Sequence, residues 1–324
     1  MAEGKENLKY KGLKPEIASE IEGYETAYFR EDKPVPFVGG LLIYPATMRE
    51  YETFSMCTSV LTLNKNEVKE GLRMSNLEFL LFKTREQTEE AQLLSYKLQK
   101  LLEIVFHIHN GIKCTSCDNV IGYHSVELMQ YIQQVQDARE KGEEVLPKLK
   151  CPKCGGTEMI DMIKFGVDPV KNKPVLFING VMIRAKDFDR LRQIILFQNF
   201  SDYRDDSWVD PAIKKDYQEK LKIQAQKNGN INATVEEKMV ALTINTSYKL
   251  EDLWDMTIRK FTMMLRQVND LIDYKITKAA IMSGFSSLPK GQTLEHWLYH
   301  KDKDMYGDSY RDAESLAADV GNLS

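Results

Sequence analysis

The stretch that decides the fold runs from Lys113-Cys114-Thr115-Ser116-Cys117-Asp118 to Lys150-Cys151-Pro152-Lys153-Cys154-Gly155-Gly156. A Cys-x-x-Cys turn delivers two thiolates to one metal ion, and a tetrahedral zinc ion takes four such ligands. The candidate metal ligands are therefore Cys114, Cys117, Cys151 and Cys154. Four cysteines leave no open coordination position, so the predicted zinc is structural. An iron site and a ribbon without metal are the alternatives.

The 33 residues between the two cysteine pairs exceed the roughly 15–20 that usually separate zinc-ribbon knuckles. Within them, 125–141 has the periodicity of a helix. Its apolar stripe consists of Val126, Leu128, Met129, Ile132 and Val135. We therefore predict a zinc ribbon with an inserted helix. His124 is expected to be an ordinary polar residue at the start of that helix, because the cysteines already complete the ligand set.

The residues before the ribbon divide into a polar N-terminal arm over 1–33, extended or partly ordered, and a helical domain over 34–110. Thr47 and Ser75 are predicted to cap helices, each with a Glu three residues later. A third helix is expected over 89–109, closed by the Asn-Gly that follows it.

After the second cysteine pair, Asn179-Gly180 predicts a hairpin with a type I′ turn. The ribbon, its inserted helix and this hairpin therefore cover 111–185. A helix capped by Asp187 and a polar excursion are expected over 186–233.

A C-terminal helical domain is predicted over 234–300, followed by a polar tail over 301–324. Thr234 is predicted to cap its first helix, with Glu237 at the box position. One helix from Leu250 to Met282, nearly 50 Å long at about 1.5 Å per residue unless kinked, is expected to end at Gly284. The predicted fold class is α+β, helix-dominated and multidomain, with an inserted zinc-ribbon module.

The composition is that of a soluble globular protein, with 43% hydrophobic and 28% charged residues. The net charge of −4 gives no global electrostatic reason to bind nucleic acid or an anionic membrane. No apolar run is long enough to cross a bilayer, and the first residues lack the apolar core of a secretory signal. The fifth cysteine, Cys57, is expected to be a buried small apolar residue.

The sequence contains no nucleophile elbow, Walker loop or dinucleotide fingerprint, so we expect no enzyme. His107 and His109 are spaced poorly for chelation on a helix, and His296 and His300 lack the carboxylate of a metalloprotease motif. A group of acidic residues in the polar excursion is expected to lie in a solvated loop. The alternative is that these residues bind a divalent metal ion and the protein is a metal-dependent hydrolase. The group comprises Asp202, Asp205, Asp206 and Asp210.

Three lysines lie beside the cysteine pairs: Lys113, Lys150 and Lys153. They can stabilise a negatively charged Zn(Cys)₄ centre, or they can contact phosphates. The second possibility makes a nucleic-acid-binding regulatory protein the alternative function. Four of the 14 methionines lie on the long C-terminal helix, where they suit either core filling or an adaptable protein-binding face.

The C-terminal run Leu250-Glu-Asp-Leu-Trp-Asp-Met-Thr-Ile-Arg-Lys-Phe-Thr-Met-Met-Leu-Arg-Gln-Val-Asn-Asp270, with the stretches that follow it to Trp297, resembles virion or tail-assembly proteins of long-tailed phages of Gram-positive hosts. Residues 42–54 and 61–66 look like the N-terminal part of the same kind of protein. The resemblance implies a tail or baseplate component, or a factor that assists its assembly, located in the virion or the bacterial host cytoplasm. Its partners would be other tail or baseplate proteins, with or without oligomerisation within the assembly, and the resemblance implies no catalytic residues.

Overall fold

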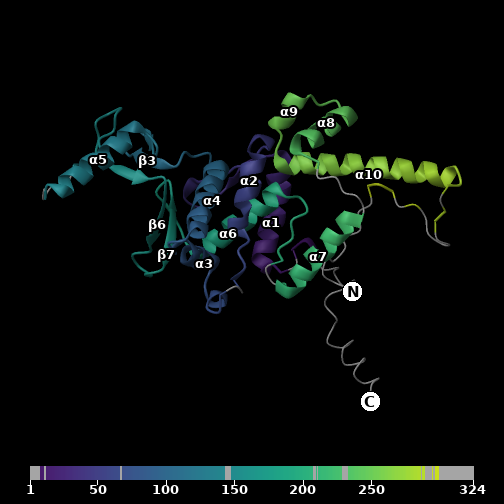
Figure 1. The fold of residues 1–324 in the computed structure, drawn as a ribbon, viewed down its shortest axis with the longest axis horizontal. Helices are drawn as coiled ribbons and strands as arrows, with labels where there is room; N and C mark the ends of the chain where they lie inside the picture. The colour runs from purple at the N-terminus through teal and green to yellow at the C-terminus, as the bar shows by residue number, and fades with distance from the viewer. Residues whose placement is uncertain are drawn as a thin grey trace, which may run out of the picture. The chain divides into compact units, whose positions relative to one another are not determined.

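The computed structural model describes residues 8–10, 12–65, 68–142, 147–206, 209, 211–227, 233–285, 287–288, 294 and 296–298. These residues form many helices and three small antiparallel sheets, so the chain is a helix-rich α+β protein (Figure 1). The chain divides into two compact units, one comprising residues 21–199 and the other comprising residues 1–20 and 200–324. The six segments predicted from the sequence are smaller than these units, and their boundaries stay predictions. Among the described residues, no helix has the length and apolar character needed to cross a membrane.

The unit of residues 21–199 is organised around one deeply buried helix, α6 (Ala185–Asn199). Ten of its 15 residues are buried, which is typical of a helix packed on all sides. Helix α3 (Asn76–Thr84) packs against it, and α2 (Tyr51–Cys57) packs against α4 (Glu89–Phe106). Asn199 at the end of α6 is buried and hydrogen-bonded: its side-chain oxygen accepts the backbone N–H of Ala46 at 2.8 Å.

Two helix starts in this unit confirm the capping boxes expected from the sequence. The backbone N–H of Thr47 donates to Glu50 at 2.9 Å, and that of Ser75 donates to Glu78 at 2.8 Å. Local side chains therefore fix where these helices begin. Short 3₁₀ helices lie at Leu8–Tyr10, Phe29–Glu31, Val38–Gly40, Met48–Glu50, Thr58–Leu61 and Gly71–Arg73.

The expectation of an extended or partly ordered arm over 1–33 is wrong for its second half. Pro15–Ala27 forms helix α1, and a 3₁₀ helix follows it. Ile21 and Phe29 are buried, so two apolar anchors suffice to order a stretch that looks polar in sequence. Residues 1–7 lie outside the described part of the chain.

Two further helix boundaries differ from prediction. Helix α4 ends at Phe106 because His107 takes a left-handed conformation, with φ of 50°, and caps it. The start of α6 lies two residues before Asp187, so Asp187 lies in the first turn and accepts the N–H of Arg184 at 3.4 Å. A carboxylate in the first turn of a helix can satisfy a free N–H without being the cap.

The ribbon sheet has the strand order β4-β3-β5, and a second sheet has the order β6-β7-β8. Met162 separates them: its N–H donates to Gly111 at 2.9 Å and its carbonyl accepts from Asn179 at 2.7 Å. Residues 159–167 therefore form two strands that belong to two different sheets. The turn prediction is confirmed by positive φ at Asn179 and Gly180, 48° and 79°. The strands are β1 (Val35–Pro36), β2 (Leu42–Ile43), β3 (Gly111–Cys114), β4 (Val120–Gly122), β5 (Met159–Asp161), β6 (Ile163–Val167), β7 (Pro174–Ile178) and β8 (Val181–Ile183).

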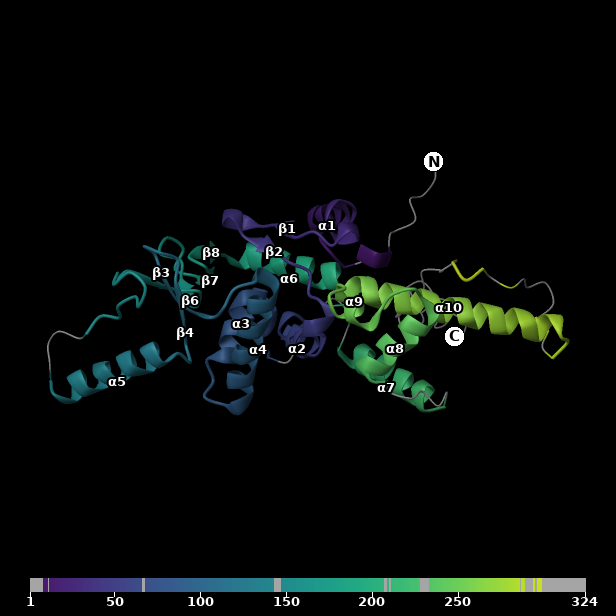
Figure 2. The same ribbon diagram turned by 90° about the horizontal axis from the view of Figure 1, so that it is seen from above.

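The inserted helix exists as α5 (Val126–Glu140), capped by the hydroxyl of Ser125, and it projects from the ribbon (Figure 2). Its predicted apolar stripe is only partly covered. Leu128 is buried, whereas Val126, Met129 and Ile132 are 66%, 59% and 42% exposed. Periodicity identifies such a stripe but does not show whether another element packs on it.

The described part of the second unit contains α7 (Pro211–Lys227), α8 (Val235–Asn245), α9 (Leu250–Trp254) and α10 (Ile258–Met282). Thr234 and Glu237 form the predicted capping box of α8. The single helix expected over 250–282 is broken, because the hydroxyl of Thr257 accepts the N–H of Lys260 at 3.3 Å and caps a new helix. The predicted tail, 301–324, lies outside the described residues.

Candidate metal centre

The first cysteine pair lies in a tight turn that follows β3. The N–H of Cys114 donates to the carbonyl of Asn119 at 2.8 Å. The carbonyl of Cys114 accepts from Asp118 at 3.0 Å, and Asp118 takes a left-handed φ of 56°. The turn therefore reverses the chain directly after the second cysteine.

The second cysteine pair repeats this turn at the same spacing. The N–H of Cys151 donates to Gly156 at 2.8 Å, and its carbonyl accepts from Gly155 at 2.8 Å. Gly155 has φ of 73° and occupies the position that corresponds to Asp118 in the first turn. Two separate segments thus adopt the same local structure, as expected of paired metal-binding knuckles.

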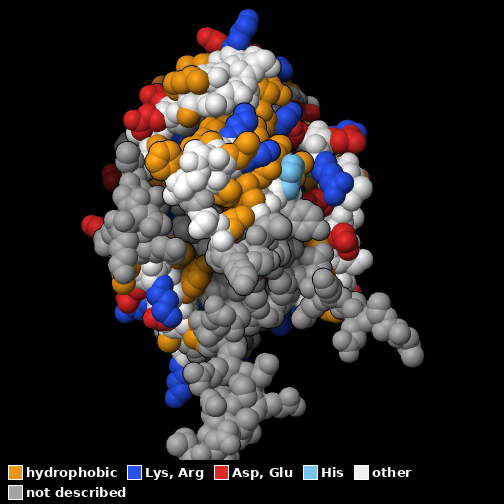
Figure 3. Space-filling view, turned by 90° about the vertical axis from the view of Figure 1, so that its right-hand side faces the viewer, with side chains coloured by type: hydrophobic (Ala, Val, Ile, Leu, Met, Phe, Trp, Pro, Cys, Tyr) orange, Lys and Arg blue, Asp and Glu red, His pale blue; other side chains and the backbone are white. Residues whose placement is uncertain are grey.

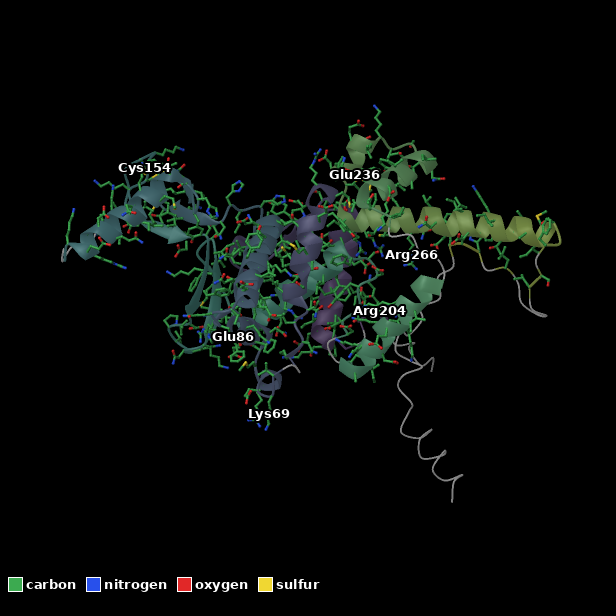
Figure 4. The ribbon with its side chains drawn as sticks, viewed as in Figure 1. Lys69, Glu86, Cys154, Arg204, Glu236 and Arg266 are labelled. Carbon is green, nitrogen blue, oxygen red and sulfur yellow. The ribbon has the colours of Figure 1, made fainter. Side chains whose placement is uncertain are left out.

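The two turns bring all four predicted cysteines together. Their sulfur atoms lie within 4.8 Å of one another, with Cys114–Cys154 at 3.6 Å and Cys117–Cys151 at 3.5 Å. A tetrahedron with zinc–sulfur bonds of about 2.3 Å has sulfur–sulfur edges of about 3.8 Å. The cluster therefore has the size and the donor atoms to hold a metal ion and is compatible with zinc. Cys154, labelled in Figure 4, is its exposed member.

Backbone N–H groups prepare the first cysteine of each pair to be a thiolate. Those of Ser116 and Cys117 lower the pKa of Cys114. Burial raises the pKa of Cys151, but hydrogen bonds from the N–H groups of Cys154 and Lys153 and from neighbouring thiols outweigh it and lower that pKa to about 6. These are the partners a metal-bound thiolate needs.

The pKa of Cys117 is raised, in contrast to the lowered pKa values of Cys114 and Cys151. The N–H of Asn119 lowers its pKa, but burial and the three neighbouring thiol groups raise it to about 12. Four thiolates at this spacing repel one another, so the fully ionised set requires a cation among them. A divalent metal supplies that charge.

The three neighbouring lysines have different surroundings. The ammonium group of Lys113 forms an ion pair with Asp118 at 2.8 Å and lies 3.4 Å from the side-chain oxygen of Asn179. It therefore ties the first knuckle to the hairpin turn. Lys150 and Lys153 are exposed beside the second knuckle.

The histidines in the described part of the chain lie outside the cysteine cluster. His107 stacks on Tyr44, with ring centroids 3.9 Å apart. His296 lies against Tyr274, 5.6 Å between ring centroids, and His300 is outside the described residues. His109 and His124 lie before and after the first cysteine pair in the sequence, and both line the same cleft.

The acidic group of the polar excursion forms no metal site in the described part of the chain. Asp206 pairs with Lys214 at 3.0 Å, and Asp205 is buried, whereas Asp210 is not among the described residues. Among the described His, Cys, Asp and Glu residues, the four cysteines are the one group close enough to hold a metal. Cys57 is buried, as predicted.

Comparison with known proteins points to one region of the chain. A search of the curated proteins and a search of the solved structures found no significant match. A family model described as the YomV second domain matches residues 224–302, and this family is phage-associated. The match spans α8, α9 and α10 and does not include the four cysteines. The C-terminal part of the chain is thus similar to a phage-associated domain.

Proposed function

We propose that the chain is a non-enzymatic structural or assembly protein of a phage tail or baseplate, braced by a structural zinc ion. It acts through protein–protein interfaces with other tail or baseplate proteins, in the virion or the host cytoplasm. The observation that carries the proposal is the apolar surface left open on the helices that match a phage-associated domain.

Exposed apolar side chains lie on both α8 and α10. Ile244 is 77% exposed, Ile276 63% and Met282 79%. Among the described side chains of α10, only Ile258, Arg259 and Phe261 are buried. Figure 3, seen from the side toward which α10 projects, shows hydrophobic side chains gathered between Lys and Arg side chains. Apolar patches with charged neighbours are typical of protein-binding surfaces, and methionine adapts to varied partners.

The zinc ion would act as a brace for the ribbon. Between β3 and β5, the described apolar residues with buried side chains are few besides the cysteines: Ile121, Leu128 and Ala138. So small a core needs a further source of stability, which a metal bound by four thiolates supplies. With every coordination position filled by the chain, the metal has no place for a substrate.

Metal analysis and particle analysis test the proposal together. We expect one zinc ion per purified chain, in a colourless protein, whereas iron on the same four thiolates would colour it. Cys57→Ala should keep the metal and Cys151→Ser should lose it. Mass spectrometry of purified tails and particles, or of their assembly intermediates, should detect the chain. A protein without zinc whose folding ignores a strong chelator, or a chain absent from all these fractions, would refute the proposal.

The alternative function is nucleic-acid binding by the ribbon, and the exposure of Lys150 and Lys153 is the observation that favours it. Phosphate contacts make binding weaken steeply with salt. Filter binding of duplex DNA and of single-stranded RNA over a salt series, with Lys150→Gln/Lys153→Gln as the comparison, tests it. No measurable affinity at low salt would remove this alternative.

A further inference from the structure

The four sulfur atoms of the cysteine cluster fall into two close pairs. The sulfur atoms of Cys114 and Cys154 are 3.6 Å apart. Those of Cys117 and Cys151 are 3.5 Å apart. Each pair joins the first cysteine turn to the second, and the two pairs share no member. Besides a metal site, the cluster therefore holds the pairing from which two disulfides between the turns can form.

Each pair combines a buried cysteine with a more accessible one. Cys114 and Cys151 are buried, whereas Cys117 is half-buried and Cys154 is exposed (Figure 4). Oxidants convert an accessible thiolate to a disulfide most readily when a second thiolate lies beside it, because that neighbour can attack the oxidised sulfur. Oxidation of the cluster is therefore expected to begin at Cys154.

The second turn leaves space beside the pair of Cys114 and Cys154. A disulfide needs a sulfur–sulfur distance of about 2.05 Å, so these two atoms have about 1.5 Å to cover. Gly156 lies next to them: an added Cβ would be 3.3 Å from the sulfur of Cys154 and 3.5 Å from that of Cys114. Because glycine lacks this atom, the two sulfur atoms have room to move together.

We propose that the cluster is an oxidation site at which peroxide replaces the metal ion by two disulfides, Cys114–Cys154 and Cys117–Cys151. The thiolate of Cys154 attacks one peroxide oxygen, the O–O bond breaks, and a sulfenic acid and a hydroxide ion form. The thiolate of Cys114 then attacks the oxidised sulfur, the S–O bond breaks, and a second hydroxide ion leaves. Protons from solvent convert both hydroxide ions to water.

A second peroxide molecule oxidises Cys117 and Cys151 in the same way, so each peroxide takes two electrons from one pair. Disulfide sulfur atoms no longer carry the negative charge that holds a zinc ion, and the ion is released to solvent. The ribbon stays closed, because Cys114 and Cys154 join the ends of the same loop in either state. A disulfide restricts the unfolded chain as a metal link does.

The inference rests on the proposed function for the place where this exchange happens. In the reducing cytoplasm of a host, thiolates persist and zinc braces the ribbon. Outside the cell, where a particle has no such protection, disulfides persist and take over the same task. The ribbon is thus held closed in both surroundings.

Oxidation of the zinc-loaded full chain with hydrogen peroxide tests the inference. The variant Cys57→Ala is used, so that the four cluster cysteines are the only ones present. We expect about two peroxide molecules per chain to release the zinc, measured with a coloured chelator, and to lower the mass by about 4 Da. Peptide mapping without reduction should find the links Cys114–Cys154 and Cys117–Cys151. In the added variant Cys154→Ser, oxidation should leave Cys114 open to alkylation.

Hydrogen exchange then compares two preparations without zinc, one oxidised and one kept reduced with a chelator. The N–H groups of Cys114 and Cys151 are hydrogen-bonded within the turns. Peptides that contain them should keep their protection in the oxidised chain and exchange roughly a thousandfold faster in the reduced chain.

Disulfides within the turns, Cys114–Cys117 and Cys151–Cys154, would overturn the inference. Zinc that resists peroxide would do the same, as would sulfinic or sulfonic acids in place of disulfides, or equal loss of protection in the two preparations. Zinc content before oxidation and presence in particles are measured separately. A chain that carries zinc and stays with particles but gives other oxidation products would refute only this inference.

Discussion

Removing the metal should open the ribbon while the helical part of the same unit stays folded. The perturbation is treatment with a strong chelator or the variant Cys154→Ser. The matched control is Cys57→Ala, which removes the cysteine that lies outside the cluster. We expect the effect to be confined to β3, β4, β5 and the two cysteine turns.

The structure sets the size of the effect. A metal ion bound by the four cysteines would close a loop of about 40 residues between Cys114 and Cys154, and loop closure of that length is worth about 4 kcal/mol. Burial of Ile121 and Leu128 contributes about 1.5–3 kcal/mol each. Ordering the backbone costs about 1–2 kcal/mol per residue, so this small core cannot hold the ribbon alone. A loss of about 4 kcal/mol corresponds to a roughly thousandfold loss of protection from local opening.

Hydrogen exchange followed by mass spectrometry measures this loss of protection directly. The N–H groups of Cys114, Asp118 and Cys151 are hydrogen-bonded within the knuckles, so peptides that contain them should lose protection when the metal is removed. Peptides from α6 should keep theirs, because that helix is buried against the helical core. Unchanged protection of the cysteine turns in metal-free protein would refute the reasoning, and so would equal loss of protection in α6.

Three other predictions concern stability. An added Cβ at Gly39 would lie 2.4 Å from Val181, whereas the neighbouring Gly40 has open space, and both have positive φ. Gly39→Ala should therefore lower the free energy of unfolding by about 1–3 kcal/mol more than Gly40→Ala in urea denaturation, and equal losses would contradict the contact. Phe188→Ala, in the core, should cost about 3–5 kcal/mol, whereas Phe285→Ala, 91% exposed, should change stability by less than about 0.5 kcal/mol. The pKa of Asp168 is lowered from 3.8 to about 2 by the side chain of Arg184 and by the N–H groups of Val170 and Lys171. Its negative charge therefore stabilises the folded chain fully above pH 4, and this stabilisation is lost as the pH falls toward 2. Asp168→Asn should thus be less stable than the original chain at pH 7, with a difference that shrinks between pH 4 and pH 2; a difference independent of pH would show that the charge is not responsible.

Features encoded by neighbouring residues were predictable from the sequence. The capping boxes at Thr47, Ser75 and Thr234 and the turn at Asn179-Gly180 are local, and their physical chemistry operates within four residues. The cysteine spacing indicated which four sulfur atoms would meet, although they come from segments far apart in the chain.

Features set by distant packing were not predictable in the same way. Apolar periodicity runs through Thr257, so nothing in the pattern alone showed that its hydroxyl starts a new helix. Ile21 and Phe29 look isolated in a polar stretch until the surrounding structure covers them. The cleft is a clearer case, because His109 and His124 are separated by the whole first knuckle and only the fold brings them to one lining.

The two backbone hydrogen bonds of Met162 have a consequence for how this part of the chain can change over evolution. One bond reaches Gly111 at the start of the ribbon, and the other comes from Asn179 in the hairpin turn. Met162 is itself buried. A deletion or exchange that removed the ribbon alone would leave the buried N–H of Met162 without its partner, the carbonyl of Gly111. The ribbon and the hairpin should therefore be gained, lost or transplanted together, as a single structural unit.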